Sequence, residues 1–248
     1  MRLLLIAFQF LTIIPLPFQI RCEKEDLGRS SAFFPLVGLV IGGMLVVADL
    51  LISPWLARPL CDALLITLLA LITGALHLDG LADVCDGLAA RGSRERFLAV
   101  MKDSQVGAVG AVGLLLGLLL KWQALVAVAP ELKWQALLLF PALARFGQVL
   151  TMTGARRARQ DGLGAAIAQG GGAAALSVAL LTSVTVSFYL LGFRGIVPLA
   201  ALCLLTFAGR IFFQRKLGGL TGDTIGCISE LNEIMVLVSI SALPQIRF

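Results

Sequence analysis

Three aspartates lie within eleven residues in the segment HLDGLADVCDG, residues 77–87. On a helix, Asp79, Asp83 and Asp86 project within about 60° of one another and share one face. Their mutual repulsion is poorly screened beside a membrane. We therefore expect a divalent cation here, and Mg²⁺ fits best because it is held by carboxylates, water and substrate phosphates. The alternative is a solvated helix end whose aspartates mark the lipid boundary. We favour the metal site, since ionisable groups clustered beside membrane spans are usually functional.

The only histidine of the chain, His77, lies in the same segment. On the same helix it points away from the carboxylates, unless the helix breaks near Gly80. Two roles therefore stay open for His77, a metal ligand and a hydrogen-bonded structural residue.

A second acidic stretch, GGLTGDTIGCISELNEI, precedes the last apolar segment. Its small residues are typical of a loop that receives phosphate on backbone N–H groups. Gly226 argues against one continuous helix through the stretch. The alternative is that the glycines only turn the chain before a helix. The residues of interest in this stretch are Gly219, Thr221, Asp223, Glu230 and Glu233.

A third polar stretch, MKDSQVGAVG, stands at the start of another apolar segment. Asp103 or Ser104 could cap the helix that begins there. The same helix N-terminus could instead receive a phosphate, with Lys102 beside it.

Four arginines could bind a phosphorylated substrate. Arg91, Arg94 and Arg96 supply positive charge for a diphosphate, or else only anchor the loop at the membrane. Arg145 lies in the middle of an apolar segment, so it needs a carboxylate or an anionic ligand as its partner.

The elements that position these residues must be membrane helices. The chain has 248 residues, of which 58% are hydrophobic and 14% charged, and its mean hydropathy is +0.95. Such values lie outside the range of water-soluble domains. Its continuous apolar runs lack the alternation of a membrane β-barrel, so we predict an all-α, polytopic membrane helix bundle in a single domain, residues 1–248.

About seven transmembrane helices are predicted, each with roughly 20 apolar residues. Residues 1–20 add an N-terminal helix that either lies at the interface or spans the bilayer. The predicted spans are residues 32–52, 60–77, 107–128, 134–153, 173–193, 196–213 and 231–247.

The basic residues are distributed unevenly between the two sets of loops that this order creates. One set carries 13 of the 20 basic residues and contains the long loops 78–106, 154–172 and 214–230. Because basic loops stay in the cytoplasm, this set should face inward. The net charge of +5 is then mainly a topology signal and argues little for nucleic acid; it also suits anionic lipid headgroups or a phosphorylated substrate.

Carboxylates that bind Mg²⁺, basic residues and glycine loops at the inner face describe phosphoryl transfer at a membrane surface. At this point the chain resembles the cobalamin synthase family, the adenosylcobinamide-GDP ribazoletransferases. The resemblance rests on HLDGLADVCDG, MKDSQVGAVG and KLGGLTGDTIGCISELNE in this order, and it extends to TIIPLP and FFPLVGLVIG near the start.

The resemblance implies an enzyme of the bacterial inner membrane that faces the cytoplasm. Adenosylcobinamide-GDP and α-ribazole, or its 5'-phosphate, would give adenosylcobalamin, or its 5'-phosphate, and GMP. By position, Asp79, Asp83 and Asp86 would hold Mg²⁺, while Asp103, Asp223 or Glu230 would complete the metal shell or accept the hydroxyl proton. The resemblance leaves open whether the protein is a homo-oligomer or associates with other enzymes of the cobalamin pathway.

Three other functions compete with this interpretation. A CDP-alcohol phosphotransferase also uses membrane aspartates and a metal, but its DGxxAR pattern is not matched by DGLADV, residues 79–84, where Asp83 interrupts it. A cation-coupled transporter predicts acids near the middle of its spans, whereas here they cluster at one face, with Asp49 and Asp62 isolated near the other. A scaffold gives no reason for three carboxylates on one helix face.

Overall fold

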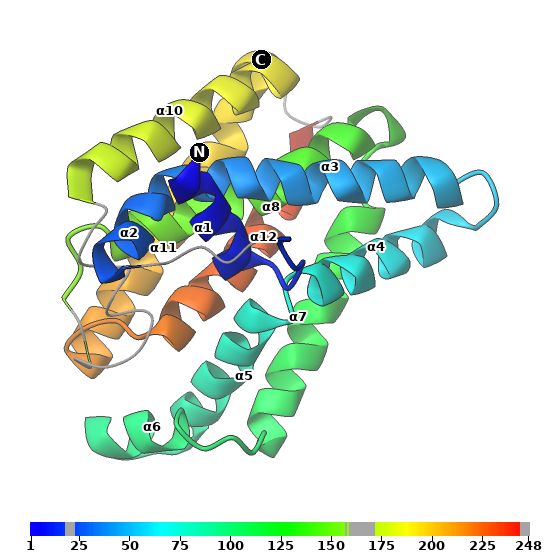
Figure 1. The fold of residues 1–248 in the computed structure, drawn as a ribbon. Coiled ribbons are helices and arrows are strands. Elements are labelled where there is room, and N and C mark those ends of the chain that lie inside the picture. The colour runs from blue at the N-terminus through cyan, green and yellow to red at the C-terminus, as the bar shows by residue number, and fades with distance from the viewer. Residues whose placement is uncertain (18–22, 157, 159–171, 244–248) are drawn as a thin grey trace.

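The computed structural model describes residues 1–17, 23–156, 158 and 172–243, and its regular elements are helices (Figure 1). Short 3-10 turns precede α3, α8 and α11. The helices are α1 (Arg2–Leu11), α2 (Lys24–Ser30), α3 (Phe34–Ile52), α4 (Arg58–Ile72), α5 (Leu76–Ala89), α6 (Arg94–Val100), α7 (Ala108–Val126), α8 (Lys133–Met152), α10 (Gly172–Leu191), α11 (Ile196–Leu217) and α12 (Gly222–Ala242).

The all-α membrane bundle is confirmed, and the chain is a multi-pass membrane protein. Among the described residues, five helical stretches are long and apolar enough to cross a membrane, and the bent pair α4–α5 adds a sixth if it is one broken span. One of the five, Gly172–Leu217, contains both α10 and α11. The predicted number of seven spans is therefore approximate.

The N-terminal helix α1 is too short to cross a bilayer by itself. Its 10 residues extend about 15 Å, half of a hydrocarbon core of about 30 Å. Of the two alternatives for the N-terminal helix, its length favours the one at the interface.

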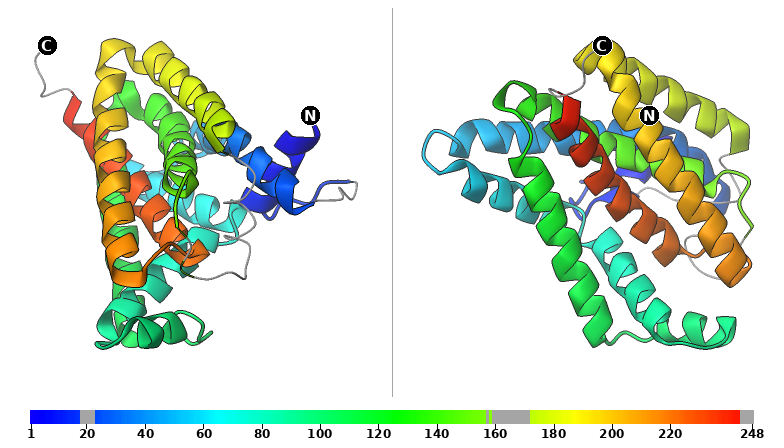
Figure 2. Two further views of the ribbon diagram at one scale, coloured as in Figure 1. Left: turned by 90° about the vertical axis from the view of Figure 1, so that its left-hand side faces the viewer. Right: turned by 180° about the vertical axis from the view of Figure 1, so that it is seen from behind.

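Helix α8 forms the centre of the bundle. Its sequence is apolar all round except for isolated polar residues, and most of its side chains are buried. It packs against α3, α10, α11 and α12, which surround it in the views of Figure 2. A helix that is buried all round needs no amphipathic stripe, so α8 can accept contacts from several partners at once.

The last span begins earlier than predicted. Helix α12 starts at Gly222 instead of residue 231 and continues without a break through Gly226. The prediction that Gly226 interrupts the helix is wrong, because the close packing of another helix at this glycine offsets its low helix propensity. Consequently Asp223, Glu230 and Glu233 are all part of a membrane helix and not of a loop.

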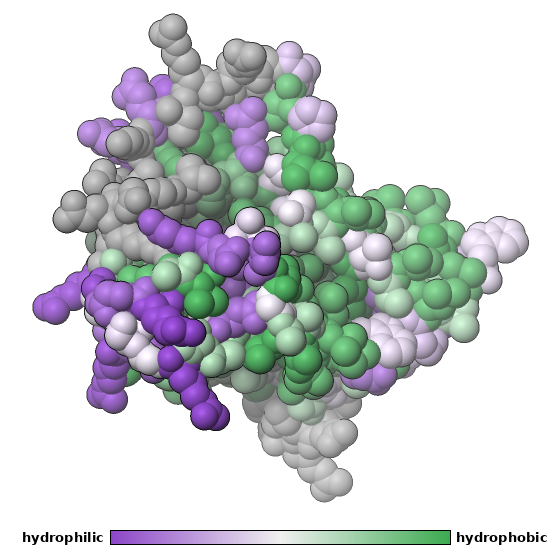
Figure 3. All heavy atoms as spheres, turned by 90° about the horizontal axis from the view of Figure 1, so that it is seen from below, coloured by the Kyte–Doolittle hydropathy of each residue, from purple (hydrophilic) through white to green (hydrophobic). Residues whose placement is uncertain are grey.

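The three long loops of the basic set meet at one end of the bundle, as predicted. Arg94 donates to the carbonyl oxygens of Leu217 (2.6 Å) and Ala158 (3.0 Å), and the backbone N–H of Leu220 donates to Arg156 (2.9 Å). Most of the loop 154–172 lies outside the described residues. Figure 3 shows hydrophilic side chains gathered on the side of the molecule where α6 and the end of α11 lie. The loops therefore form one polar surface.

The opposite end carries a second group of charges. Arg58 pairs with Asp49 (2.6 Å) and Asp62 (2.5 Å), and Lys133 pairs with Asp62 (3.1 Å). The prediction that Asp49 and Asp62 are isolated is wrong, because both belong to an ion-pair cluster that ties α3, α4 and the start of α8 together.

Candidate active site

The segment with the three aspartates forms its own helix after a sharp turn. Helix α4 ends at Ile72, and the chain then passes through Gly74 (φ +60°) and Ala75 (φ +56°) before α5 begins. Glycine adopts this left-handed conformation without strain, whereas alanine adopts it at some cost. The two helices meet at 91°, so α5 runs toward the polar end of the bundle.

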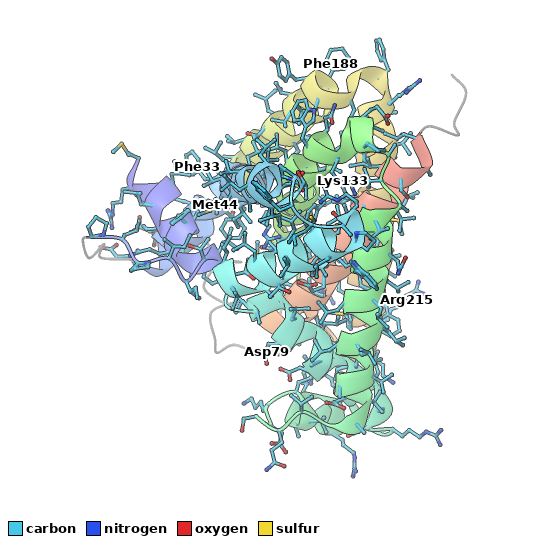
Figure 4. The ribbon with its side chains drawn as sticks, turned by 90° about the vertical axis from the view of Figure 1, so that its right-hand side faces the viewer. Phe33, Met44, Asp79, Lys133, Phe188 and Arg215 are labelled. Carbon is cyan, nitrogen blue, oxygen red and sulfur yellow. The ribbon has the colours of Figure 1, made fainter. Side chains whose placement is uncertain are left out.

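The carboxylates lie on α5 as the helical spacing predicts. Asp79 is exposed in the first turn, while Asp83 and Asp86 are half-buried one and two turns later. Figure 4 places Asp79 at the edge of the molecule, above the end that carries α6. Asp79 is therefore open to a ligand that approaches from this end.

Helix α5 crosses the start of α12 almost backbone to backbone. A β-carbon on Gly80 would lie 2.7 Å from the carbonyl oxygen of Asp223, and one on Gly226 would lie 3.3 Å from the Cα of His77. Because these two glycines face the crossing, Asp223 lies beside the turn of α5 that holds Asp79 and Asp83. This approach explains why glycine is needed at position 80.

Asp86 caps the N-terminus of α7. Its two carboxylate oxygens accept the backbone N–H groups of Gly107 and Gly110, each at 2.7 Å. Of the two alternatives for this helix start, capping by Asp103 or Ser104 is not found, since Gly107 is the N-cap residue and Asp86 supplies the acceptors. In this conformation both carboxylate oxygens of Asp86 are engaged by the helix that it caps.

A pocket of about 350 Å³ lies next to Asp86, between α5, α6 and the start of α7. Asp103 and Gln105 supply its further polar groups, and alanine and valine side chains supply most of the remaining wall. Asp103 accepts the backbone N–H of Gln105 at 3.1 Å, and its side chain is exposed. The pocket therefore joins the aspartate motif to the MKDSQVGAVG motif.

The predicted phosphate loop is shorter than expected. Thr221 is the N-cap of α12, and it exchanges hydrogen bonds with Thr224 in a capping box. Gly222 and Gly226 are helical, so only Gly218 and Gly219 remain in the turn that precedes the cap. The start of α12 therefore presents a helix N-terminus, which favours anions.

Most of the predicted substrate-binding residues lie around this end. Arg91, Lys102 and Ser104 are exposed in the loops on either side of α6. Because these loops connect α5 and α7 through α6, the side chains lie at the same polar end of the bundle as the aspartates. Gly219, by contrast, is buried in its turn.

Glu230 and Arg145 lie apart from this surface, in a buried cluster. Arg145 of α8 pairs with Glu233, and Lys121 of α7 pairs with both Glu230 and Glu233, the latter at 2.6 Å. The prediction that Arg145 needs a partner in the membrane is confirmed, and its partner is Glu233. Lys121 and Glu233 received no role from the sequence, although a lysine within an apolar run is a sign of such a pairing.

His77 lies inside the bundle and forms a hydrogen bond there. It is buried, and its Nε2 lies 2.8 Å from the side-chain nitrogen of Gln148. Gln148 also donates to the hydroxyl of Ser229 at 2.7 Å. His77 therefore joins α5 to α8 and α12.

The carboxylates do not form a closed metal site in this structure. Within the described ranges, no group of three or more His, Cys, Asp or Glu side chains is arranged to hold a metal ion. Asp79 and Asp83 lie on α5 at its crossing with the start of α12, which carries Asp223, and carboxylate oxygens are donors of the type that Mg²⁺ binds. The carboxylates of Asp86 and Glu230 bind a helix N-terminus and a buried lysine, respectively.

Comparisons with known proteins give the same family over nearly the whole chain. Residues 3–241 match the family model for cobalamin-5-phosphate synthase. A curated adenosylcobinamide-GDP ribazoletransferase from Geotalea daltonii is 58% identical over 98% of both chains. Proteins of the same name from Clostridium botulinum strain Okra (35%, covering 94% of this chain and 95% of the relative) and Caldanaerobacter subterraneus (31%, 98% and 99%) are also similar. No solved structure matches the chain.

Proposed function

Because the chain belongs to the cobalamin-5-phosphate synthase family, we propose that it is an adenosylcobinamide-GDP ribazoletransferase, the enzyme of the final assembly step of cobalamin. It transfers adenosylcobinamide phosphate from adenosylcobinamide-GDP to α-ribazole or α-ribazole 5'-phosphate and releases GMP. The observation that carries the proposal is the crossing of α5 and α12 at Gly80, which places Asp223 beside the turn of α5 that holds Asp79 and Asp83.

The reaction replaces the phosphoanhydride bond of the diphosphate by a phosphate ester bond. The hydroxyl of the ribazole forms a bond with the phosphorus that carries the cobinamide, and the bond from this phosphorus to the oxygen of GMP breaks. The hydroxyl proton passes to a carboxylate, for which Asp103 and Asp223 are the candidates. Asp103 lines the pocket beside α5, and Asp223 adjoins the crossing.

Asp79, Asp83 and Asp223 are the residues that would hold Mg²⁺. When bound, the ion offsets the negative charge of the diphosphate and of the departing GMP. Arg91 and Lys102 add positive charge at the same surface, and the N-terminus of α12 after Thr221 favours the phosphates. This set omits Asp86, which caps a helix, and Glu230, which lies in an ion pair.

We also propose that the polar surface faces the cytoplasm and that the membrane is the bacterial inner membrane. The concentration of basic residues in the loops that meet at this end supports the orientation. Cysteines introduced at the exposed positions Glu95 and Trp55 report the two ends. In inverted vesicles, an impermeant maleimide should label Glu95→Cys and leave Trp55→Cys at the background of the native cysteines; the reverse pattern would refute the orientation.

The activity is tested by GMP release from purified protein in lipid nanodiscs. The wild type, supplied with adenosylcobinamide-GDP, α-ribazole and Mg²⁺, should release GMP and form the cobalamin, and EDTA should abolish both. Asp79→Asn should lose the activity while the protein stays folded. Glu131→Gln, which removes an exposed carboxylate at the other end of the bundle, serves as the matched control and should remain active.

The outcomes separate the parts of the proposal. Folded wild-type protein that releases no GMP with either form of ribazole would overturn the assignment, and CDP-linked alcohols would be tested next. Activity that persists in EDTA would overturn the metal site alone. Co-purification from native membranes tests whether the protein acts as a homo-oligomer, binds other enzymes of the cobalamin pathway or retains membrane lipid.

A further inference from the structure

A buried polar network lies directly beneath the crossing of α5 and α12. Its upper layer is the chain of hydrogen bonds from His77 through Gln148 to Ser229. These residues come from α5, α8 and α12, and each of them is at most 5% exposed. Gln148 uses both hydrogens of its amide nitrogen, one toward each of the two neighbouring helices.

The lower layer is the cluster of four charges, one helical turn deeper. Arg145 precedes Gln148 by one turn of α8, and Glu233 follows Ser229 by one turn of α12. The pairs Arg145–Glu233 and Lys121–Glu230 with Lys121–Glu233 join α7, α8 and α12. Two cations and two carboxylates balance, so the network carries no net charge when the four groups are ionised.

Stability alone does not explain this network. A buried ion pair loses much of its attraction to the desolvation of its charges, and apolar side chains of similar volume often stabilise a core as well or better. Moreover, within the part of the chain that the structure describes, Nδ1 of His77 and Nε of Arg145 are buried without a hydrogen-bond partner, so the network is not saturated. The network instead fixes the relative position of the helices. Hydrogen bonds require specific partners to align, whereas apolar packing alone leaves helices free to slide along one another.

The register that it fixes is the one on which the site depends. Helix α5 has no side-chain cap at its N-terminus and follows a 91° turn, so His77 is its first anchor to the bundle. Asp79 lies two residues further on, and Asp223 lies less than two turns before Ser229 on α12. A displacement of Gln148 would therefore move both Asp79 on α5 and Asp223 on α12.

We propose that Gln148, together with His77, Ser229 and the charged cluster of Lys121, Arg145, Glu230 and Glu233, forms a positioning network for the transfer reaction. It holds α5 against α12 and sets the separation of Asp79 and Asp83 from Asp223. These residues act through the carboxylates and do not touch the substrate. The inference rests on the function proposed above and adds to it a positioning role for these residues.

The test replaces Gln148 by methionine, which keeps the volume and removes both hydrogen bonds. The matched control is Gln135→Met, the same change on the same helix about 20 Å away, next to the ion pairs of the opposite end. Figure 4 shows how far Lys133, near this control, lies from Asp79. For both variants the readouts are kcat and KM for GMP release per folded protein and, without substrate, Mn²⁺ affinity by electron paramagnetic resonance.

Gln148→Met should lower kcat and weaken Mn²⁺ binding by about 10- to 100-fold, as the loss of supporting hydrogen bonds does at other metal sites, while KM changes little. Gln135→Met should leave all three values within about twofold. A Gln148→Met protein that folds and keeps both kcat and Mn²⁺ affinity within about twofold of the wild type would overturn the inference.

If Gln148→Met does not fold, Ser229→Ala, which removes a single hydroxyl, takes its place with the same expected direction. Failure of the wild type to release GMP concerns the proposed function instead, so the two failures are distinguishable. A purely stabilising network would lower the melting temperature of Ser229→Ala and leave the kcat of the folded protein unchanged, and that result would also overturn the inference.

Discussion

The replacement of Gly80 by alanine tests whether the crossing of α5 and α12 controls the site. The new β-carbon would lie 2.7 Å from the carbonyl oxygen of Asp223, whereas ordinary van der Waals contact begins at 3.4 Å. The obstacle is backbone, so it cannot rotate away as a side chain would. The two helices must therefore separate by about 0.7 Å at this point, which moves Asp79 and Asp83 away from Asp223.

A displacement of this size is sufficient to change the rate strongly. A misplacement of about 1 Å at a reacting group can lower a rate by about 100-fold, so we expect kcat for GMP release to fall by about 10- to 100-fold in Gly80→Ala. The intrinsic stability of helix α5 should increase, since alanine is favoured over glycine in a helix interior by about 1 kcal/mol. Loss of activity should therefore exceed any loss of stability.

Two other glycines provide a graded comparison. A β-carbon added to Gly43 of α3 would meet no atom of the described chain within 4 Å, so Gly43→Ala should leave kcat unchanged and keep or raise the melting temperature. Gly226 faces the Cα of His77 at 3.3 Å, so Gly226→Ala should have a small effect. GMP release and thermal unfolding in nanodiscs measure the series, and a Gly80→Ala enzyme as active as Gly43→Ala would refute the reasoning.

Three further substitutions probe single contacts, each followed by thermal unfolding and GMP release. Asp86→Ala removes the acceptors of two backbone N–H groups at the start of α7 and should destabilise the protein by about 1–2 kcal/mol; an unchanged melting temperature would contradict the capping role. Glu233→Gln leaves two buried cations with one carboxylate and should lower the free energy of unfolding by about 3–5 kcal/mol. An unchanged melting temperature would show that the pairs do not form. Lys133→Met, which deprives Asp62 of a partner at the opposite end, should lower the melting temperature while the folded protein keeps its kcat, and a fall in kcat would show that the two ends are coupled.

The class of the protein and the face of aspartates could be predicted from the sequence because both are local. Hydropathy follows from residue types alone, and the spacing of Asp79, Asp83 and Asp86 places them on one face of any helix. The unequal distribution of basic residues likewise predicted which loops belong together. These features depend on neighbours in the chain, which the sequence shows directly.

The roles of individual carboxylates depended on contacts between distant residues. Asp86 caps a helix whose N–H groups lie 21 and 24 residues away, and Glu230 pairs with a lysine 109 residues away. Spacing in the sequence contains no information on which of the three aspartates will meet such a partner. As a result, the sequence suggested Asp86 and Glu230 as metal ligands, whereas the fold binds their carboxylates to a helix N-terminus and to a buried lysine.

The last helix also shows the difference between what the sequence predicts and what packing decides. Taken alone, Gly226 predicts a break, because glycine loses more backbone entropy on folding than other residues. In the folded protein the missing side chain allows α5 to approach within contact of α12, and the packing that results keeps the helix continuous from Gly222. The sequence by itself determined a membrane bundle with an acidic helix face, and only the tertiary structure decided which acids bind a helix N-terminus or a buried cation, since helix crossings and buried pairings exist only once the helices are packed.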